Sequence, residues 1–260
     1  GDAPDPLTDL ADMQCMWFVL EEGESYIRQK KWGKALKRFH QIEKHFADIT
    51  DDQFDFHTYC LRKVTLRAYL RHISTDKHSD QLRSHPYYFR AAQNAIKIYI
   101  ELYDNPNTVT VSEENEDYAN MTEGEKKKLR SKANKAAHKK QKEDEERKAK
   151  EDVKKKVDKP QDDDPDGEKL LKTEDPLGEA FKFLLPLQEL SPKRIETHLL
   201  GFEIYLRKKK YLLALRALLR AYNIDKENAT LHNDIIRFHL AVSDDKEINP
   251  TVNQVIASEK

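Results

Sequence analysis

The fold of this chain is decided by one stretch near its amino end, residues 23–39, which read GESYIRQKKWGKALKRF. The small residues Gly23 and Ala35 are each followed, three or four positions later, by an aromatic residue, Tyr26 or Phe39. Small residues allow two antiparallel helices to approach closely, and aromatic residues one turn further along fill the space beside the crossing. The stretch therefore predicts a helical hairpin with all four of these residues at its core.

The same spacing recurs near the carboxyl end of the chain. The second copy consists of Tyr205, Tyr211, Ala214, Leu218 and Ala221, with Phe202 in the position of the glycine. This spacing is typical of tetratricopeptide repeats, which are pairs of helices of about 34 residues that stack into a solenoid. Two degenerate copies leave an ordinary helical bundle as the alternative. We predict an all-α, tetratricopeptide-like α-solenoid.

Helical periodicity, proline positions and charge divide the 260 residues into six segments. The predicted segments are a disordered start (1–9), a helical block (10–104), an acidic linker (105–121), a long basic helix (122–159), an acidic disordered linker (160–174) and a second helical block (175–260). The first block is expected to hold helices over 10–30 and 34–46, a helix that starts at a capping box on Thr50, and one from Pro86 to Asp104. The second is expected to hold helices from Asp175, over 195–208, 211–222, 229–242 and 249–258, with Pro186 kinking or ending the first of them.

The net charge of −1 hides a strong asymmetry. Residues 126–159 carry 16 basic and 7 acidic side chains, a net charge of +9. The basic residues that no acid interrupts are Lys126, Lys127, Lys128, Arg130, Lys132, Lys135, Lys139, Lys140 and Lys142. Such a cluster favours a polyanion, and the absence of aromatic residues favours phosphate contacts over base contacts. Three interpretations stay open: rRNA binding, a nuclear-import signal and a solvated helix.

Sites for chemistry are not evident in this sequence. The seven glycines stand singly, so no glycine-rich loop can receive a phosphate or pyrophosphate. His57 and Cys60 lie one turn apart, but nothing nearby completes a catalytic triad or a zinc site, and we expect both to be packed. A small-anion pocket, as an alternative to salt bridges or plain solvation, would use Lys37, Arg38, Arg62, Lys63 and Arg67. We expect no catalytic, cofactor-binding or metal-binding residue.

The surroundings of the protein can also be predicted. Cys15 and Cys60 lack the spacing of a disulfide framework, which indicates a reducing, intracellular compartment. No apolar run reaches the length of a membrane span, and the first residues do not form a signal peptide. Gly1 in place of Met leads us to expect a piece of a longer protein.

Four stretches carry a resemblance to a known family. They read MQCMWF (13–18), TDDQFDFHTYC (50–60), HP (85–86) and IETHL (195–199). Together they resemble the later part of the auxiliary subunit of the N-terminal acetyltransferase A complex, in which a basic helix and an acidic linker follow in the same order. Residues 74–81 depart from the family pattern, which usually has a short helical stretch there.

The resemblance implies a non-catalytic scaffold that wraps the catalytic subunit and anchors it near the ribosomal exit tunnel. Acetyl-CoA would then bind the partner, and the inositol polyphosphate that bridges the two subunits in this family is expected upstream of Gly1. The implied partners are the catalytic subunit, the ribosome with its rRNA, an importin and a small regulatory protein, with no membrane. The expected location is the cytoplasm, with a nuclear fraction. The alternative is a stand-alone RNA-binding or ribosome-associated helical repeat protein.

Overall fold

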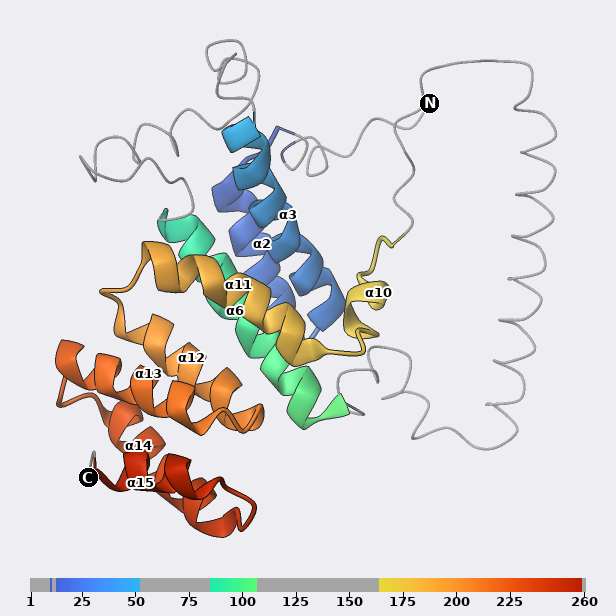
Figure 1. Ribbon diagram of the computed structural model, residues 1–260. Coiled ribbons are helices and arrows are strands. Elements are labelled where there is room, and N and C mark those ends of the chain that lie inside the picture. The colour runs from blue at the N-terminus through green and yellow to red at the C-terminus, as the bar shows by residue number, and fades with distance from the viewer. Residues whose placement is uncertain (1–9, 11–12, 52–84, 107–163, 259–260) are drawn as a thin grey trace, which may run out of the picture. The chain divides into compact units, whose positions relative to one another are not determined.

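The computed structural model describes residues 10, 13–51, 85–106 and 164–258 (Figure 1). Every regular element within these ranges is a helix, which confirms the all-α prediction. The helices are α2 (Met16–Arg28), α3 (Trp32–Asp51), α6 (Pro86–Asp104), α10 (Glu168–Leu171), α11 (Pro176–Leu190), α12 (Ile195–Arg207), α13 (Tyr211–Ile224), α14 (Ala229–Asp244) and α15 (Pro250–Ser258). None of these helices is long and apolar enough to cross a membrane.

Helices α2 and α3 form the predicted hairpin. Ala35 and Phe39 are fully buried, and Gly23 is buried against the ring of Phe39. A Cβ on Gly23 would lie 2.7 Å from Cε1 of Phe39, so the crossing needs the hydrogen of glycine at this position. Tyr26 is half-buried, and its hydroxyl donates a hydrogen bond to Glu22 (3.0 Å).

Helices α12 and α13 form the second hairpin, in which Phe202, Tyr205, Ala214 and Ala221 are all buried. Its turn repeats that of the first hairpin. The N–H of Lys210 donates to the carbonyl of Tyr205 (2.8 Å), as Lys31 N–H does to Tyr26 (2.9 Å). Lys209 and Lys30 occupy the left-handed position in these turns, with φ of 52° and 60°, where helix ends usually place glycine. The two hairpins therefore have the same turn conformation, with the same backbone hydrogen bond and the same left-handed residue.

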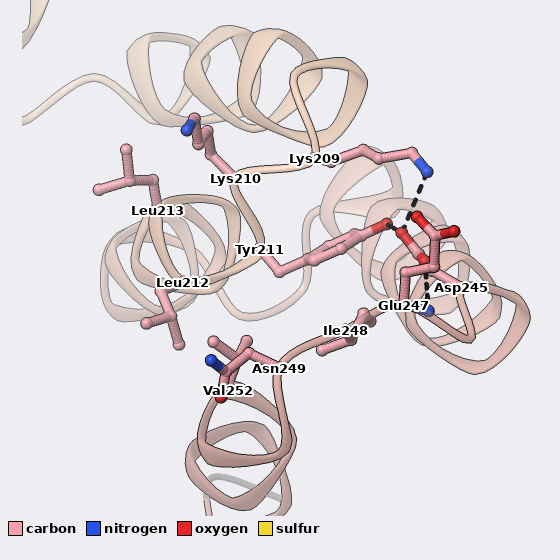
Figure 2. Close-up of a pocket in the computed structure, with 10 residues that line it drawn as sticks. All are labelled: Lys209, Lys210, Tyr211, Leu212, Leu213, Asp245, Glu247, Ile248, Asn249 and Val252. Carbon is pink, nitrogen blue, oxygen red and sulfur yellow. Dashed lines mark hydrogen bonds and ion pairs between the residues drawn. The ribbon is translucent and has the colours of Figure 1, made fainter.

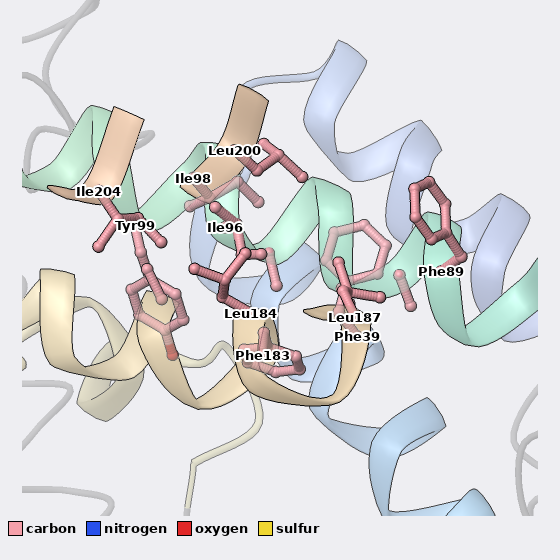
Figure 3. Packing of buried hydrophobic residues seen from close by; sticks show 14 of the residues in the cluster. Phe39, Phe89, Ile96, Ile98, Tyr99, Phe183, Leu184, Leu187, Leu200 and Ile204 are labelled. Atoms are coloured by element: carbon pink, nitrogen blue, oxygen red, sulfur yellow. The ribbon is translucent and has the colours of Figure 1, made fainter. Parts of the chain in front are cut away.

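The predicted helical blocks pack together as one unit rather than as two separate bodies. Helix α6 contacts α2 and α3 of the first block as well as α11 and α12 of the second (Figure 1). Figure 3 shows Phe39 of α3 and Tyr99 of α6 in the same cluster as Phe183 of α11. All three are 0–1% exposed, so neither block has a core of its own that is complete without the other.

The segment before α11 differs from the prediction of an acidic disordered linker over 160–174. Its described part, from residue 164 onward, includes α10, which contacts α3. Asp166 forms an ion pair with Lys34 (3.2 Å), and Gly167 is buried against Gly33. The acidic composition suggested solvent exposure, but a close backbone contact and one ion pair hold this segment to the start of α3.

Two helix boundaries also differ from the predictions, and at Pro186 one of the two predicted outcomes, a kink or an end of the helix, is excluded. The helix predicted over 10–30 is interrupted: α2 starts at Met16, because Gln14 just before it has a left-handed φ of 56°. Thr50 is one of the last residues of α3 and does not begin a new helix. Helix α11 continues through Pro186 to Leu190, and Pro186 is buried on its inner face. Residues 52–84 and the predicted basic helix at 122–159 lie outside the described residues.

Candidate interaction groove

The basic residues predicted to bind a polyanion, Lys126 to Lys142, all lie outside the described residues, as do His57 and Cys60. Of the predicted small-anion pocket, only Lys37 and Arg38 are described. Arg38 pairs with Glu22 through its Nε atom (2.8 Å) and also donates to Gln41 (3.1 Å). Salt bridging, the alternative to the pocket, therefore accounts for Arg38.

The described residues hold a cavity of about 500 Å³ lined by α6, α12 and α14. Its lining residues on α12 recur every three or four positions, at Glu196, Leu199, Leu200, Glu203 and Arg207, and so follow one face of that helix. Lining residues on α6 do the same. The cavity is therefore a groove along α12, flanked by the two neighbouring helices. We call it the α12 groove.

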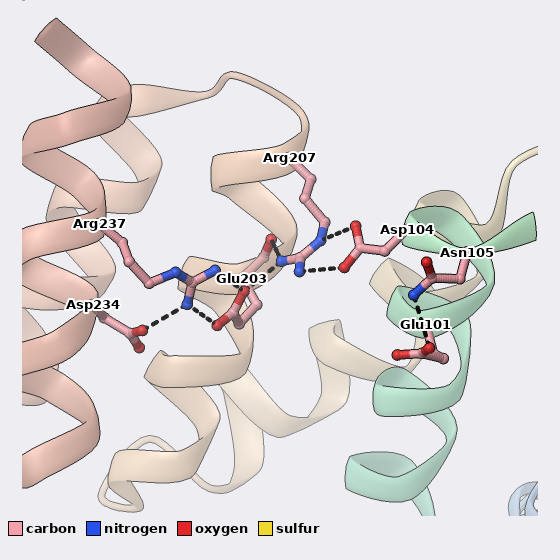
Figure 4. A network of polar contacts seen from close by, with 7 residues as sticks. All are labelled: Glu101, Asp104, Asn105, Glu203, Arg207, Asp234 and Arg237. Carbon is pink, nitrogen blue, oxygen red and sulfur yellow. Dashed lines mark hydrogen bonds and ion pairs between the residues drawn. The ribbon is translucent and has the colours of Figure 1, made fainter. Parts of the chain in front are cut away.

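A chain of ion pairs crosses this groove and ties its three helices together (Figure 4). Arg207 of α12 binds both carboxylate oxygens of Asp104 on α6, at 2.9 and 2.6 Å. Arg207 also pairs with Glu203, which in turn pairs with Arg237 of α14. Arg237 completes the series by donating to Asp234 (2.8 Å). Three carboxylates thus alternate with two guanidinium groups.

The pKa values of Glu203 and Asp234 move in opposite directions. Burial alone would raise the pKa of Glu203, but hydrogen bonds from Arg237 and Arg207 outweigh it and hold that pKa below its usual value. The pKa of Asp234 is raised, first by burial and then by the nearby charge of Glu203. Glu203 therefore acts as the anionic centre of the network, whereas Asp234 carries a charge that its surroundings stabilise poorly.

Asp234 is the most unusual residue of the groove. Its side chain is only 1% exposed, and its Oδ1 atom accepts the hydrogen bond from Arg237. Its Oδ2 atom is buried and has no hydrogen-bond partner among the residues that the structure describes. A buried carboxylate oxygen without a donor costs free energy, so this atom is the one in the groove that would gain most from a ligand.

Sequence reasoning did not single out the residues of this network. The spacings of Glu203 to Arg207 and of Asp234 to Arg237 are those of helical ion pairs and could have been noticed. The pairing of Arg207 with Asp104, which lies 103 positions away in the sequence, has no local signal.

A second cavity, of about 400 Å³, lies where the end of the α12–α13 turn meets the α14–α15 loop (Figure 2). The hydroxyl of Tyr211 donates to Asp245 (2.6 Å), which also pairs with Lys209 (3.2 Å). Burial and the hydrogen bond to Asp245 raise the pKa of Tyr211 to about 12, so the phenol stays neutral. These contacts join the second hairpin to the α14–α15 loop, which is a structural role.

Metal binding finds no support in the ranges that the structure covers, since no group of His, Cys, Asp or Glu there could hold an ion. What the described surface offers is a set of paired helices, a charged groove and side-chain networks between helices. This arrangement suits the binding of macromolecules better than the conversion of a small substrate.

Comparison with known proteins assigns the chain to a family. Residues 1–221 match the family model for "N-terminal acetyltransferase A, auxiliary subunit". A mouse relative, "N-alpha-acetyltransferase 16, NatA auxiliary subunit", is 43% identical over 97% of this chain and 30% of its own length. The Arabidopsis thaliana "N-terminal acetyltransferase A complex auxiliary subunit NAA15" is 44% identical over 91% of this chain and 26% of its own.

A solved structure of Naa15/Naa10 bound to HypK-THB contains a similar chain, with a TM-score of 0.65 and 36% identity. The match covers 99% of this chain and 30% of that one, so the present chain spans about 30% of the length of these relatives. The family model covers most of the chain, and identities above 40% extend over nearly all of it. The predicted resemblance is confirmed: the chain belongs to the N-terminal acetyltransferase A auxiliary-subunit family.

Proposed function

We propose that this chain is part of a non-catalytic auxiliary subunit that scaffolds the catalytic subunit of a co-translational N-terminal acetyltransferase. The observation that carries the proposal is the similarity over 99% of the chain to a protein solved as Naa15/Naa10. In that assembly the similar chain is accompanied by a second protein. Acetyl-CoA would bind the catalytic partner rather than this chain.

The fold supports a scaffolding role on physical grounds. Helical hairpins that contact mainly their neighbours leave long faces of each helix free for partners. The described helices α13 and α14 expose Leu212, Leu219, Ile236 and Leu240, each between 38 and 60%. Apolar residues exposed at several neighbouring positions are typical of surfaces that other chains cover.

The proposal extends to three further partners. The basic residues from Lys126 to Lys142 would bind rRNA at the ribosome or an importin, and a small regulatory protein would join the complex, as HypK does in the structure of the relative. The protein would accordingly be cytoplasmic, with a nuclear fraction.

The test is a purification of the full-length protein, tagged at its own locus, followed by mass spectrometry. We expect the catalytic acetyltransferase subunit to be recovered at a ratio close to one to one. Recovery of ribosomal components without any acetyltransferase subunit would contradict the proposal and would favour a stand-alone ribosome-associated repeat protein. Acetyl-CoA turnover by the isolated 260-residue chain would contradict its non-catalytic part.

A further inference from the structure

The α12 groove combines an apolar floor with a carboxylate-rich rim. Ile100, Leu199 and Leu200 contribute the apolar lining, and all three are buried or half-buried. The acidic lining residues are Glu101, Asp104, Glu196, Glu203 and Asp234, whereas the basic ones are Lys97 and Arg207. A segment that fills this groove must therefore offer apolar surface and positive charge together.

The internal ion pairs do not neutralise this excess of negative charge. Arg207 is shared between Asp104 and Glu203, and Arg237 is shared between Glu203 and Asp234. The network therefore keeps one carboxylate more than it has guanidinium groups. Glu101 and Glu196 add two further acids against Lys97. An anionic ligand would be repelled, whereas a cation would complete the alternation.

Asp234 fixes where that cation would bind. Its unpartnered Oδ2 is a buried acceptor beside the groove, at the end of the series of ion pairs (Figure 4). Opposite charges attract more strongly beside a buried group than in bulk water. A cation in the groove next to Asp234 would therefore stabilise a carboxylate that its own surroundings stabilise poorly.

The apolar floor decides between a metal ion and a basic side chain. A metal ion prefers several oxygen ligands around it and gains nothing from leucine or isoleucine. Lysine and arginine have long methylene stems that lie well on apolar surface while the charged end reaches a carboxylate. The cavity, at about 500 Å³, has room for such a side chain together with its neighbours.

We propose that the α12 groove is the docking site for a basic segment of a partner protein, whose Lys or Arg side chain lies on Leu199 and Leu200 and whose positive charge faces the carboxylate of Asp234 from within the groove. This binding does not depend on the proposed scaffold function. It would give the chain a contact with a cationic partner, separate from the polyanion contact expected of its own basic segment.

The test measures binding of labelled peptides to the full chain by fluorescence anisotropy. One probe is a twelve-residue peptide with leucine at every third or fourth position and arginine at the positions between. Its match replaces each arginine by citrulline, which keeps the shape and removes the charge. We expect the arginine peptide to bind at least about tenfold more tightly than the citrulline peptide. Equal affinities would overturn the proposal.

Variants of the chain locate the binding. Asp234→Asn keeps the size of the side chain and should weaken the arginine peptide by about tenfold. If that variant melts at a much lower temperature, the pair Glu101→Gln and Glu196→Gln, which also line the groove, serves the same purpose. The control is Glu189→Gln with Glu227→Gln, two exposed acids outside the groove. Loss of affinity in the control but not in the groove variants would contradict the assignment of the binding site to the α12 groove.

A competitor tests the nature of the occupant. A peptide that copies residues 126–142 of this chain is first added as a competitor to the complex of the chain with the arginine peptide. The arginine peptide is then titrated against a variant of the chain in which the basic residues of 126–142 are alanine. Unchanged affinity in the alanine chain supports an external partner. An affinity that rises about tenfold in the alanine chain would show that the chain's own segment fills the groove and would overturn the assignment to a partner.

Discussion

Gly33 and Gly167 touch through their backbones: a Cβ on Gly167 would lie only 2.1 Å from the carbonyl oxygen of Gly33. Gly167 also has a φ of +72°, which side-chain-bearing residues adopt at a cost. This contact brings the segment before α11 onto the first turn of α3, beside the ion pair of Lys34 and Asp166. Residues 166–167, which follow the basic segment in the sequence, are thereby held to α3.

Replacing Gly167 by alanine should therefore destabilise the protein. The new methyl group would clash with backbone atoms that cannot rotate away, and the left-handed φ would add strain, for a loss of about 2 to 4 kcal/mol. Urea unfolding of the 260-residue chain measures the change. Gly201→Ala is the control, because its Cβ would be 3.3 Å from the flexible amide of Gln188 and lies within a helix. Similar losses for both substitutions would contradict the contact.

Enlarging Ala35 to tryptophan should disrupt the α2–α3 crossing. Ala35 is fully buried in that hairpin, so the indole would force the two helices apart at a cost of about 1 to 3 kcal/mol. The melting temperature should drop by several degrees. Ala257→Trp, at an exposed position of α15, should leave it unchanged. A melting temperature that Ala35→Trp does not lower would argue against the repeat assignment.

Glu203 should contribute stability that acid removes. Its pKa in the folded chain lies below the usual value, because the hydrogen bonds from Arg237 and Arg207 exceed the effect of burial. The free energy that it contributes is therefore fully present above the unfolded pKa of about 4.3 and is lost as the pH falls through the lower folded value. Glu203→Gln should lower stability at pH 7 by about 1 to 3 kcal/mol and should flatten this acid limb.

Asp234 gives the internal comparison for that experiment. Its pKa is raised rather than lowered, so Asp234→Asn should not reduce the acid sensitivity of unfolding. Denaturant titrations at pH 3.5, 4.5 and 7 on the two variants and the parent would separate the two residues. If both variants changed the acid limb alike, the assignment of Glu203 as the anionic centre would be wrong.

His40 should make the protein less stable as the pH falls below neutrality. Its Nε2 lies 2.7 Å from the hydroxyl of Tyr99, and its ring packs on Phe183 with centroids 4.9 Å apart. Burial lowers the pKa of His40, so the stability it contributes is present above the unfolded pKa of about 6.5 and is lost as the pH falls through the folded value.

His40→Gln should reduce the slope of stability between pH 7.5 and 5, measured by urea unfolding at several pH values. His198, whose pKa is also lowered by burial, keeps part of the slope in that variant. His232 is exposed on α14, and His232→Gln serves as the control. A slope that is the same in His40→Gln and in the parent would refute the role of this residue.

The basic segment should bind ribosomes through phosphates. Exchanging Lys126, Lys127, Lys128, Arg130, Lys139 and Lys140 for glutamate should weaken ribosome association while leaving the catalytic subunit bound. Affinity of the parent should fall with salt by nearly one power for each phosphate neutralised. Ribosome co-sedimentation over a series of KCl concentrations measures both. Full affinity in the mutant would leave nuclear import or plain solvation, and its nuclear fraction would decide between them.

The amino-acid sequence determined the class of fold and the two helical hairpins. Gly23 lies against the ring of Phe39, and Tyr26, Ala35 and Phe39 belong to one apolar cluster, across a single turn of the chain, so the spacing of these residues predicts their packing. The apolar periodicity of each helix likewise shows which face is buried, because the period of the helix is fixed. Local patterns do not fix every helix boundary: Thr50 satisfies a capping pattern, yet the preceding helix continues through it.

The tertiary structure alone decided which buried faces meet and where the α12 groove lies. An apolar stripe on one helix does not specify which other helix will cover it. The packing of α6 against α11, which joins the two blocks, therefore could not be predicted from the local sequence. Arg207 pairs with Asp104, which is 103 positions away in the sequence, and Glu203 pairs with Arg237, which is 34 positions away. Both pairs form because folding brings their helices together. Charge favours such pairs only at short distance, and distance is a property of the folded chain.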